Sequence, residues 1–315
     1  MPDEKPKIVV AEHIDDAALE RLRDAGEVQL LDAGDESSLI RALADADALV
    51  VRSYTNVTAS VIRAGKRLRV IGRGGVGLEN IDLQAARAQG VTVVYTPAAA
   101  TEAVAEHTVG LMLALERHLL TGDAMVRDHR FEQARSSLLS RDLRDCTLGV
   151  VGMGRIGTAV ARICHAGLNM PILYNDIRDI DPLPFSAEAV DKDTLYAGSD
   201  VVTLHVPLTE QTRGLINSSA LNRFKADATL INTARGAVVD AEALAEALRM
   251  GRLGGAAIDV FDPEPPPKDH PLLSSPSVLL SPHIAARTKA GLARMNDVVD
   301  DVVAVLEGRA PSYPA

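Results

Sequence analysis

The stretch that decides the fold is LGVVGMGRIG, residues 148–157. Four apolar residues predict a buried strand, and the glycines after it, Gly152, Gly154 and Gly157, have the G-x-G-x-x-G spacing. The first glycine permits a tight turn, the second lets a pyrophosphate approach the backbone, and the third lets the following helix pack on the strand. The start of that helix offers unpaired N–H donors to phosphate. The stretch therefore predicts the phosphate-binding turn of a dinucleotide site, against the alternative of a purely structural glycine turn.

The next apolar run, residues 172–175, leads directly into Asp176. A carboxylate there can accept hydrogen bonds from both ribose hydroxyls of NAD, and it repels the 2′-phosphate of NADP. Its distance from the glycines is about what the fingerprint requires, which favours a coenzyme site over a structural turn. Arg178, two residues further on, could instead bind a 2′-phosphate. We therefore predict NAD as the cofactor, with NADP as the alternative.

Short apolar runs alternate with amphipathic helical patterns on both sides of this motif. The predicted strands are 8–11, 28–31, 48–51, 70–72 and 91–95 before it, and 147–151, 172–174, 200–204, 229–232, 255–259 and 278–280 from it onward. Such alternation predicts parallel sheets with helices on both faces, because right-handed crossovers place helices on either side.

Two long helical patterns connect the predicted domains. The first, 101–120, has Thr101 as its expected N-cap, and the last, 286–307, is expected to return to the first group of strands. We therefore predict an α/β protein with two Rossmann-like parallel-sheet domains. A dinucleotide-binding domain, 101–284, is inserted in a flavodoxin-like substrate-binding (catalytic) domain made of 1–100 and 285–315.

Composition excludes several classes of protein. The chain has 315 residues, more than one domain usually needs, and a formal net charge of -10, which disfavours nucleic acid and acidic membranes as partners. Its two cysteines, Cys146 and Cys164, have no neighbours that suggest a disulfide framework or a metal site, so no metal is expected. The short charged segment 1–7 and the absence of a long apolar run predict a cytoplasmic protein without membrane spans.

Three further segments, 232–236, 259–265 and 281–285, follow predicted strands of the second group. Carboxyl ends of parallel strands are where ligands bind in such sheets. Oxidising an alcohol requires a base for the hydroxyl proton, and the imidazole of His283 suits this role near neutral pH. A carboxylate, Glu264, could fix its tautomer, and the fork of Arg235 could bind a substrate carboxylate. Taken alone, His283 is more simply explained as a structural histidine, and Arg235 and Glu264 as solvated surface residues. Their combination with the glycine motif favours a catalytic site.

These residues carry a resemblance that covers nearly the whole chain. The markers are 51–53, 72–77, 104–106, 152–157, 205–208, 232–236, 259–265 and 281–285. In this order and spacing they resemble the D-isomer-specific 2-hydroxyacid dehydrogenase family. The resemblance implies a catalytic trio of Arg235 for the substrate carboxylate and carbonyl, Glu264 as the partner of the imidazole, and His283 as acid and base.

The resemblance also implies contacts to coenzyme and substrate. For the cofactor they are Val76, Gly152, Gly154, Arg155, Ile156, Gly157, Asp176, His205, Val206, Pro207, Thr233, Ala234, Arg235, Asp259, His283 and Ala285. For the substrate they are Arg52, Ser53, Gly74, Gly75, Val76, Gly77, Arg235 and His283. Successive glycine N–H groups in 72–77 suit a carboxylate, although a structural glycine turn is the alternative.

The resemblance implies an NAD-dependent oxidoreductase that acts on the CH–OH group of a small 2-hydroxy acid. Its substrate would be 3-phosphoglycerate or hydroxypyruvate and glyoxylate, between which the sequence does not decide. The alternative is an NAD-sensing corepressor-like binding protein with vestigial activity, because such relatives keep the trio.

Several remaining features are left open by the sequence. The resemblance implies a homodimer built through the helix near Thr101 and the arm 119–144, and the end at Ala315 predicts no added regulatory domain. Asn175 could share the role of Asp176. Arg287 replaces a small residue common in the family, and it could contact a substrate phosphate, narrow the pocket or face solvent.

Overall fold

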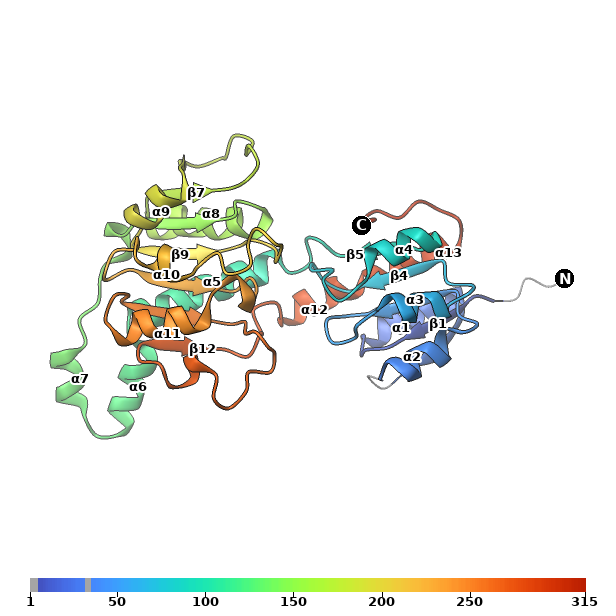
Figure 1. The fold of residues 1–315 in the computed structure, drawn as a ribbon, viewed down its shortest axis with the longest axis horizontal. Coiled ribbons are helices and arrows are strands. Elements are labelled where there is room, and N and C mark those ends of the chain that lie inside the picture. The colour runs from blue at the N-terminus through green and yellow to red at the C-terminus, as the bar shows by residue number, and fades with distance from the viewer. Residues whose placement is uncertain (1–4, 32–34) are drawn as a thin grey trace. The chain divides into compact units, whose positions relative to one another are not determined.

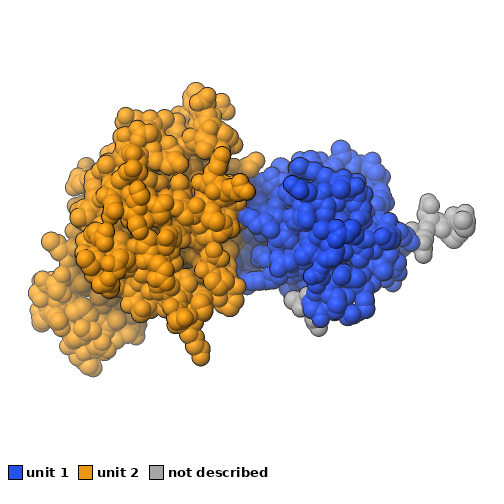
Figure 2. Space-filling model, in the orientation of Figure 1, with its two compact units in different colours: residues 1–100, 287–315 blue, residues 101–286 orange. Residues whose placement is uncertain are grey.

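The structure is a computed structural model that describes residues 5–31 and 35–315. The chain divides into two compact units, unit 1 with residues 1–100 and 287–315 and unit 2 with residues 101–286 (Figures 1 and 2). Part of the charged N-terminal segment, residues 1–4, lies outside the described residues. Each unit is built on its own sheet, so each is described by itself.

Unit 1 contains a five-stranded sheet in which each pair of neighbouring strands is parallel. The strands are β1 (Lys7–Val10), β2 (Glu27–Leu30), β3 (Ala48–Val51), β4 (Val70–Arg73) and β5 (Thr92–Tyr95). Their order is β2-β1-β3-β4-β5, which is the flavodoxin-like order. The helices are α1 (Asp16–Ala25), α2 (Glu36–Leu43), α3 (Ala59–Ala64), α4 (Leu83–Gln89), α12 (Lys289–Asn296) and α13 (Val298–Leu306).

Side-chain alternation along these strands gives unit 1 two hydrophobic cores, one on each face. Val9, Leu49 and Ile71 pack with residues of α2, α3 and α4 on one face. Residues one position along each strand, such as Val50 and Val70, pack with α1 and α13 on the other. Because α13 comes from the end of the chain, unit 1 is discontinuous in sequence.

Unit 2 contains a seven-stranded parallel sheet. The strands are β6 (Leu148–Val151), β7 (Ile172–Asn175), β8 (Glu188–Ala189), β9 (Val201–Leu204), β10 (Thr229–Asn232), β11 (Gly255–Ile258) and β12 (Val278–Leu280). The order β12-β11-β10-β9-β6-β7-β8 places the strand before the glycine motif, β6, between β9 and β7, where the direction of winding reverses. This is the Rossmann order, and its reversal point is where dinucleotides bind. The predicted pair of parallel-sheet α/β domains is confirmed.

Helices cover both faces of this sheet as well. They are α5 (Thr101–Glu116), α6 (Leu119–Arg127), α7 (Phe131–Ser137), α8 (Arg155–Leu168), α9 (Lys192–Gly198), α10 (Ser218–Leu221) and α11 (Ala241–Arg249), with short 3₁₀ turns at Leu143–Asp145, Gly236–Val238 and Pro271–Ser274. Helices α5 and α8 pack on one core, and α9, α10 and α11 pack on the other. Figure 1 shows α6 and α7 as an arm that projects from the layered body of unit 2.

Two helix predictions were wrong in detail. The expected helix 101–120 ends at Glu116, because His118 takes a left-handed backbone conformation, φ 52°, and a new helix begins at Leu119. Thr101 is the first residue of α5 and its buried hydroxyl has no hydrogen-bond partner among the described residues, so it is no side-chain cap. The expected helix 286–307 is two helices, which meet at Asp297.

The boundary between the units falls at Arg287, two residues later than the sequence suggested. The reason is a hydrogen bond, since the N–H of Ala285 donates to the carboxylate of Asp259 at 3.0 Å and ties this residue to unit 2. In the part of the chain that the structure describes, no helix has the length and apolar character that crossing a membrane requires.

Candidate functional site: a coenzyme turn and a histidine–carboxylate pair

The glycine motif joins β6 to α8, and its three glycines meet different surroundings. Gly152 has φ 93°, and a Cβ there would lie 2.6 Å from the carbonyl oxygen of His205. A Cβ at Gly157 would lie 2.0 Å from the carbonyl oxygen of Gly152. A Cβ at Gly154 would have, among the described residues, only Arg178 Nη2 within 4 Å, at 3.9 Å. The first and third glycines are thus required by the fold, whereas the second leaves open space beside the backbone.

The space beside Gly154 suits a phosphate group. Gly154 is the N-cap of α8 and has no side chain to bond the first N–H groups of that helix. The N–H groups of Arg155 and Ile156 have no acceptor in the described part of the chain. Orphan donors at the positive end of a 14-residue helix form an anion-binding site. The residues present therefore fit a dinucleotide pyrophosphate.

Asp176 follows β7 and lies directly against the glycine turn. One carboxylate oxygen accepts a hydrogen bond from Met153 N at 2.8 Å, and the other accepts one from Arg178 N at 2.9 Å. The side chain is only 8% exposed. Asn175 is occupied elsewhere, since its amide donates to the carbonyl of Val190 at 2.7 Å. Of Asn175 and Asp176, the structure places Asp176 against the turn.

Further predicted coenzyme residues of unit 2 follow β9 and β10, at the same edge of the sheet. His205 lies beside Thr203, with the ring Nε2 2.9 Å from the hydroxyl oxygen, and burial lowers the pKa of the imidazole. It is therefore neutral at pH 7. The hydroxyl of Thr233 pairs with that of Thr108 at 2.9 Å. Val206 and Pro207 continue from His205, and Ala234 continues from Thr233.

His283 and Glu264 form a direct pair. The Nδ1 atom of His283 lies 2.7 Å from Oε2 of Glu264, and the other carboxylate oxygen accepts a hydrogen bond from Phe261 N at 2.9 Å. The side chains are 45% and 37% exposed, so the imidazole remains open to a ligand. Burial raises the pKa of Glu264, but the hydrogen bonds from His283 and Phe261 N and the charges of His283 and Arg235 outweigh it. The net pKa lies below the ordinary value, and Glu264 is ionised at neutral pH.

Arg235 follows β10 beside this pair. Its Nη1 donates to the carbonyl of Ala234 at 2.6 Å, and its charge is among the causes that lower the pKa of Glu264. A Cβ at Gly236 would lie 2.0 Å from the carbonyl carbon of Phe261, so the segments that carry Arg235 and Glu264 pack backbone against backbone. The structure thereby brings together all three residues of the predicted trio.

Asp259 has surroundings that the sequence did not reveal. Its carboxylate is fully buried and accepts hydrogen bonds from the hydroxyl of Ser281 at 2.5 Å and from the N–H groups of Ile284 and Ala285 at 3.0 Å. Its carbonyl accepts the N–H of His283, at 2.7 Å. His283 itself has φ 52°, a left-handed conformation that costs a non-glycine residue energy. These bonds hold the histidine in that conformation.

Two residues of this network were missed by the sequence reasoning. Ser281 bonds Asp259, and His107 Nε2 lies 3.5 Å from the same carboxylate oxygen and 3.3 Å from the Ser281 hydroxyl. His107 lies on α5, far from Asp259 in sequence, so no spacing signal was available to find it. Ser281, two residues before His283, was within the marker segment but was given no role.

The predicted substrate residues of unit 1 lie after β3 and β4. Arg52 and Ser53 follow β3, and the loop 74–77 follows β4. Gly75 has φ 143°, and a Cβ there would overlap the guanidinium of Arg73. The N–H groups of Gly75, Val76 and Gly77 have no acceptor in the described residues. The loop therefore presents free backbone donors next to a buried arginine.

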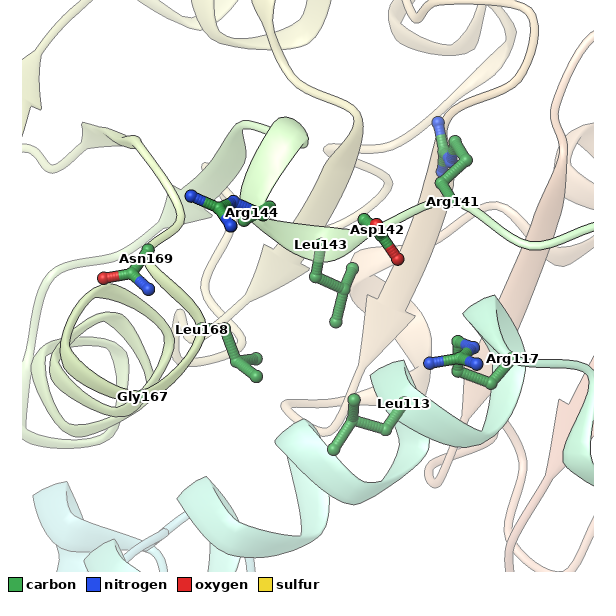
Figure 3. Close-up of a pocket in the computed structure, with 9 residues that line it drawn as sticks. All are labelled: Leu113, Arg117, Arg141, Asp142, Leu143, Arg144, Gly167, Leu168 and Asn169. Atoms are coloured by element: carbon green, nitrogen blue, oxygen red, sulfur yellow. The ribbon is translucent and has the colours of Figure 1, made fainter.

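A cavity of about 360 Å³ in unit 2 lies away from these residues (Figure 3). Arg117 and Arg144 lie on opposite sides of it, and Leu113 and Leu168 line it between them. None of the predicted site residues is among its lining residues. The described part of the chain also contains no group of three or more His, Cys, Asp or Glu side chains arranged to hold a metal ion.

A Rossmann sheet with a glycine turn, joined to a flavodoxin-like unit, defines a class of two-unit α/β proteins that bind dinucleotides. Residues 109–285 match the model of a family described as D-isomer specific 2-hydroxyacid dehydrogenase, NAD binding domain. The chain belongs to this family, and the family resemblance inferred from the sequence is confirmed.

The relatives match nearly the whole of this chain, but the chain spans different shares of their own lengths. Glyoxylate reductase of Thermofilum pendens is 39% identical over 98% of this chain and 93% of the relative. D-3-phosphoglycerate dehydrogenase of Archaeoglobus fulgidus is 40% identical over 96% of this chain, which spans only 58% of that relative. The crystal structure of TT0316 protein from Thermus thermophilus superposes with a TM-score of 0.90, at 40% identity, over 98% of this chain and 99% of that one.

Proposed function

We propose that this protein is an NAD-dependent D-2-hydroxyacid dehydrogenase, an oxidoreductase that acts on the CH–OH group of a small 2-hydroxy acid. The observation that carries the proposal is the hydrogen bond of 2.7 Å between His283 Nδ1 and Glu264, in a unit whose glycine turn fits a dinucleotide. In the reduction, a hydride adds to C2 of a 2-keto acid and a proton adds to its oxygen. When bound, the nicotinamide ring supplies or accepts the hydride.

The imidazole of His283 moves the proton. Because its Nδ1 is held by Glu264, its Nε2 is the atom that faces the substrate, donating a proton to the carbonyl oxygen in reduction and accepting it in oxidation. Ionised Glu264 stabilises the imidazolium form. Arg235 binds the substrate carboxylate and polarises the carbonyl through charge-assisted hydrogen bonds.

Residues of unit 1 are also proposed as substrate contacts, as the family resemblance implies. The free N–H groups of Gly75, Val76 and Gly77 form a nest of the kind that binds small anions, and Arg73 adds positive charge beside it. Arg52 and Ser53 are proposed to contact the same substrate. Any bulkier residue at Gly75 would be strained, which supports a role for this loop that depends on its backbone.

NAD is the proposed coenzyme. Asp176 lies at the end of β7, where its carboxylate can accept hydrogen bonds from ribose hydroxyls while it holds the N–H of Met153. Arg178 is 66% exposed and lies near Gly154, and this arrangement favours some use of NADP. The coenzyme contacts proposed from Val76, His205, Val206, Pro207, Thr233, Ala234, Asp259 and Ala285 rest on the family resemblance.

The proposal is tested by following NADH absorbance with glyoxylate, hydroxypyruvate, pyruvate, 2-oxoglutarate and 3-phosphohydroxypyruvate. Turnover of at least one acid is expected, and His283→Ala should reduce kcat/KM by about 10²–10⁴-fold, the usual contribution of general acid–base catalysis. His13→Ala, an exposed histidine of unit 1, is the matched control and should leave turnover unchanged. Tight NADH binding without any turnover would favour an NAD-sensing, corepressor-like protein instead.

We also propose that the protein is a cytoplasmic homodimer. The arm formed by α6, α7 and the segment after them exposes apolar side chains at Leu119, Leu120, Val126, Phe131 and Leu139, which is 90% exposed. Exposed apolar side chains gathered on one arm are characteristic of a protein interface.

The cysteines support the proposed location. Cys146 and Cys164 are buried and unpaired, which suits a reducing compartment.

A further inference from the structure

The loop that carries His283 is fastened to a helix that lies far from it in sequence. His107 on α5 has its ring Nε2 3.3 Å from the hydroxyl oxygen of Ser281, which follows β12, and 3.5 Å from Oδ1 of Asp259, which follows β11. The three side chains come from three elements of unit 2. They meet where the loop 281–285 begins.

The chemistry of the three groups sets the direction of each hydrogen bond. Burial raises the pKa of Asp259, but hydrogen bonds from His107, Ser281 and two backbone N–H groups outweigh it, and the net pKa lies below the ordinary value. Because an ionised carboxylate only accepts, the Ser281 hydroxyl donates its one proton to Asp259, at 2.5 Å. The oxygen of Ser281 then accepts from His107. Nε2 of His107 therefore carries a proton, as it does in one neutral tautomer and in the imidazolium.

This chain of bonds ends at the backbone of His283 and of the two residues after it. The carbonyl of Asp259 accepts the N–H of His283 at 2.7 Å, and its carboxylate accepts the next two N–H groups at 3.0 Å. The left-handed conformation of His283, φ 52°, costs energy and persists only where the surroundings fix it. His107 contributes the bonds that tie this turn to α5, a helix of 16 residues.

We propose that His107 is a positioning residue for the dehydrogenase reaction. Through Ser281 and Asp259 it holds the backbone of His283. Glu264 orients the same imidazole through Nδ1, so backbone and ring are fixed by separate contacts. The inference rests on the proposed function, and it adds a residue that acts on proton transfer through others. Because misplacing a reacting group by 1 Å can cost about 100-fold in rate, loss of the His107 bonds should slow the chemical step.

Two amide substitutions test the Nε2 donor of His107. The side-chain N–H of Gln extends about as far as Nε2 of histidine, whereas that of Asn is one methylene shorter and falls short of Ser281. The measurement is the single-turnover rate of NADH oxidation at saturating keto acid, in enzyme loaded with NADH, so that weaker binding does not enter. We expect His107→Asn to lower this rate by about 10- to 100-fold. His107→Gln should remain within about threefold of the wild type, a difference of less than about 1 kcal/mol.

A double substitution tests whether His107 acts through Ser281. Ser281→Ala alone should lower the single-turnover rate, and adding His107→Asn should lower it by less than about threefold more, because residues of one hydrogen-bonded chain are not additive. Arg117→Leu changes an exposed residue directly after α5, and as the control it should leave the rate unchanged. Circular dichroism of each variant ensures that folded proteins are compared.

The outcomes separate this inference from the proposed function. A wild-type rate in His107→Asn, or an equal loss in His107→Asn and His107→Gln, would overturn the positioning role while the dehydrogenase activity stands. Full additivity of the His107 and Ser281 substitutions would also overturn it, because His107 would then act by another route. No turnover of any acid by the wild type, with NADH bound, would contradict the proposed function and this inference with it.

Discussion

At the scale of the residue, the proposed proton transfer depends on one hydrogen-bonded pair, His283 and Glu264. Glu264 is held on one side by Phe261 N and on the other by His283, so its position is fixed before substrate binds. A preorganised carboxylate stabilises the imidazolium without reorganisation during the reaction. The function of the pair therefore depends on the charge of Glu264.

Glu264→Gln tests this dependence. The amide keeps the shape of the side chain but removes the negative charge, so the imidazolium loses stabilisation. The pKa of Glu264 lies below the ordinary value, so the wild type carries this charge at neutral pH, and the variant should reduce a 2-keto acid with a kcat/KM that is lower by about 10- to 100-fold. The measurement is kcat/KM for NADH-dependent reduction at neutral pH in both proteins. An unchanged kcat/KM would show that the charge of Glu264 does not act on His283.

The sequence predicted the trio because all three residues follow strands within recognisable segments. It did not predict what holds them. The bonds from Asp259 to Ser281 and to the N–H groups after His283 depend on a left-handed backbone at His283, which the hydrophobic pattern of the sequence does not reveal. His107 reaches the same carboxylate from another element, a long-range contact that only the folded chain brings about.

At the scale of the element, the turn between β6 and α8 separates structural from functional glycines. Gly157 and Gly152 touch backbone atoms, whereas Gly154 faces open space. A methyl group at position 154 therefore fits the fold but occupies the space proposed for the pyrophosphate.

Gly154→Ala and Gly157→Ala should accordingly differ. The first should change the free energy of unfolding by less than about 1 kcal/mol and weaken NADH binding at least tenfold. The second should destabilise the protein by about 1–3 kcal/mol, because its Cβ overlaps a carbonyl oxygen. Chemical denaturation and NADH fluorescence titration measure the two quantities.

Gly167→Ala is the control within the same helix. No atom of the described residues lies within 4 Å of its Cβ position, so the substitution should stabilise the helix by about 0.5–1 kcal/mol and leave NADH binding unchanged. Unimpaired NADH affinity in Gly154→Ala would place the phosphates elsewhere.

Element types were more predictable than element ends. Buried parallel strands are near-continuous apolar runs, so β3, β6 and β10 could be found from sequence. The breaks at His118 and Asp297 could not, because neither residue is a glycine or proline and the hydrophobic pattern continues across them. Tertiary packing decides such breaks.

At the scale of the whole molecule, the exposed arm carries the proposed assembly. Helices α6 and α7 pack against each other, and they leave Phe131 56% exposed and Leu139 90% exposed. Burial of an apolar side chain stabilises an interface by about 1.5–3 kcal/mol, so introducing charges at two of them should dissociate a dimer.

The double substitution Phe131→Glu and Leu139→Glu is expected to convert a dimer to a monomer at micromolar concentration, with unchanged circular dichroism. Analytical ultracentrifugation checks the mass. Met250→Glu is the control, because Met250 lies outside the arm and is as exposed as Phe131. This substitution should leave the dimer intact. A wild-type protein that sediments as a monomer would refute the proposed homodimer.

The central claim is direct hydride transfer to C2 of a 2-keto acid, and its most direct test uses NADH with deuterium at both C4 positions. Reaction with the best substrate among hydroxypyruvate, pyruvate, 2-oxoglutarate and 3-phosphohydroxypyruvate, whose reduction products are chiral at C2, is followed by mass spectrometry and chiral chromatography. We predict a D-2-hydroxy acid with one deuterium on C2. A product without deuterium at C2, or with the L configuration, would contradict the account.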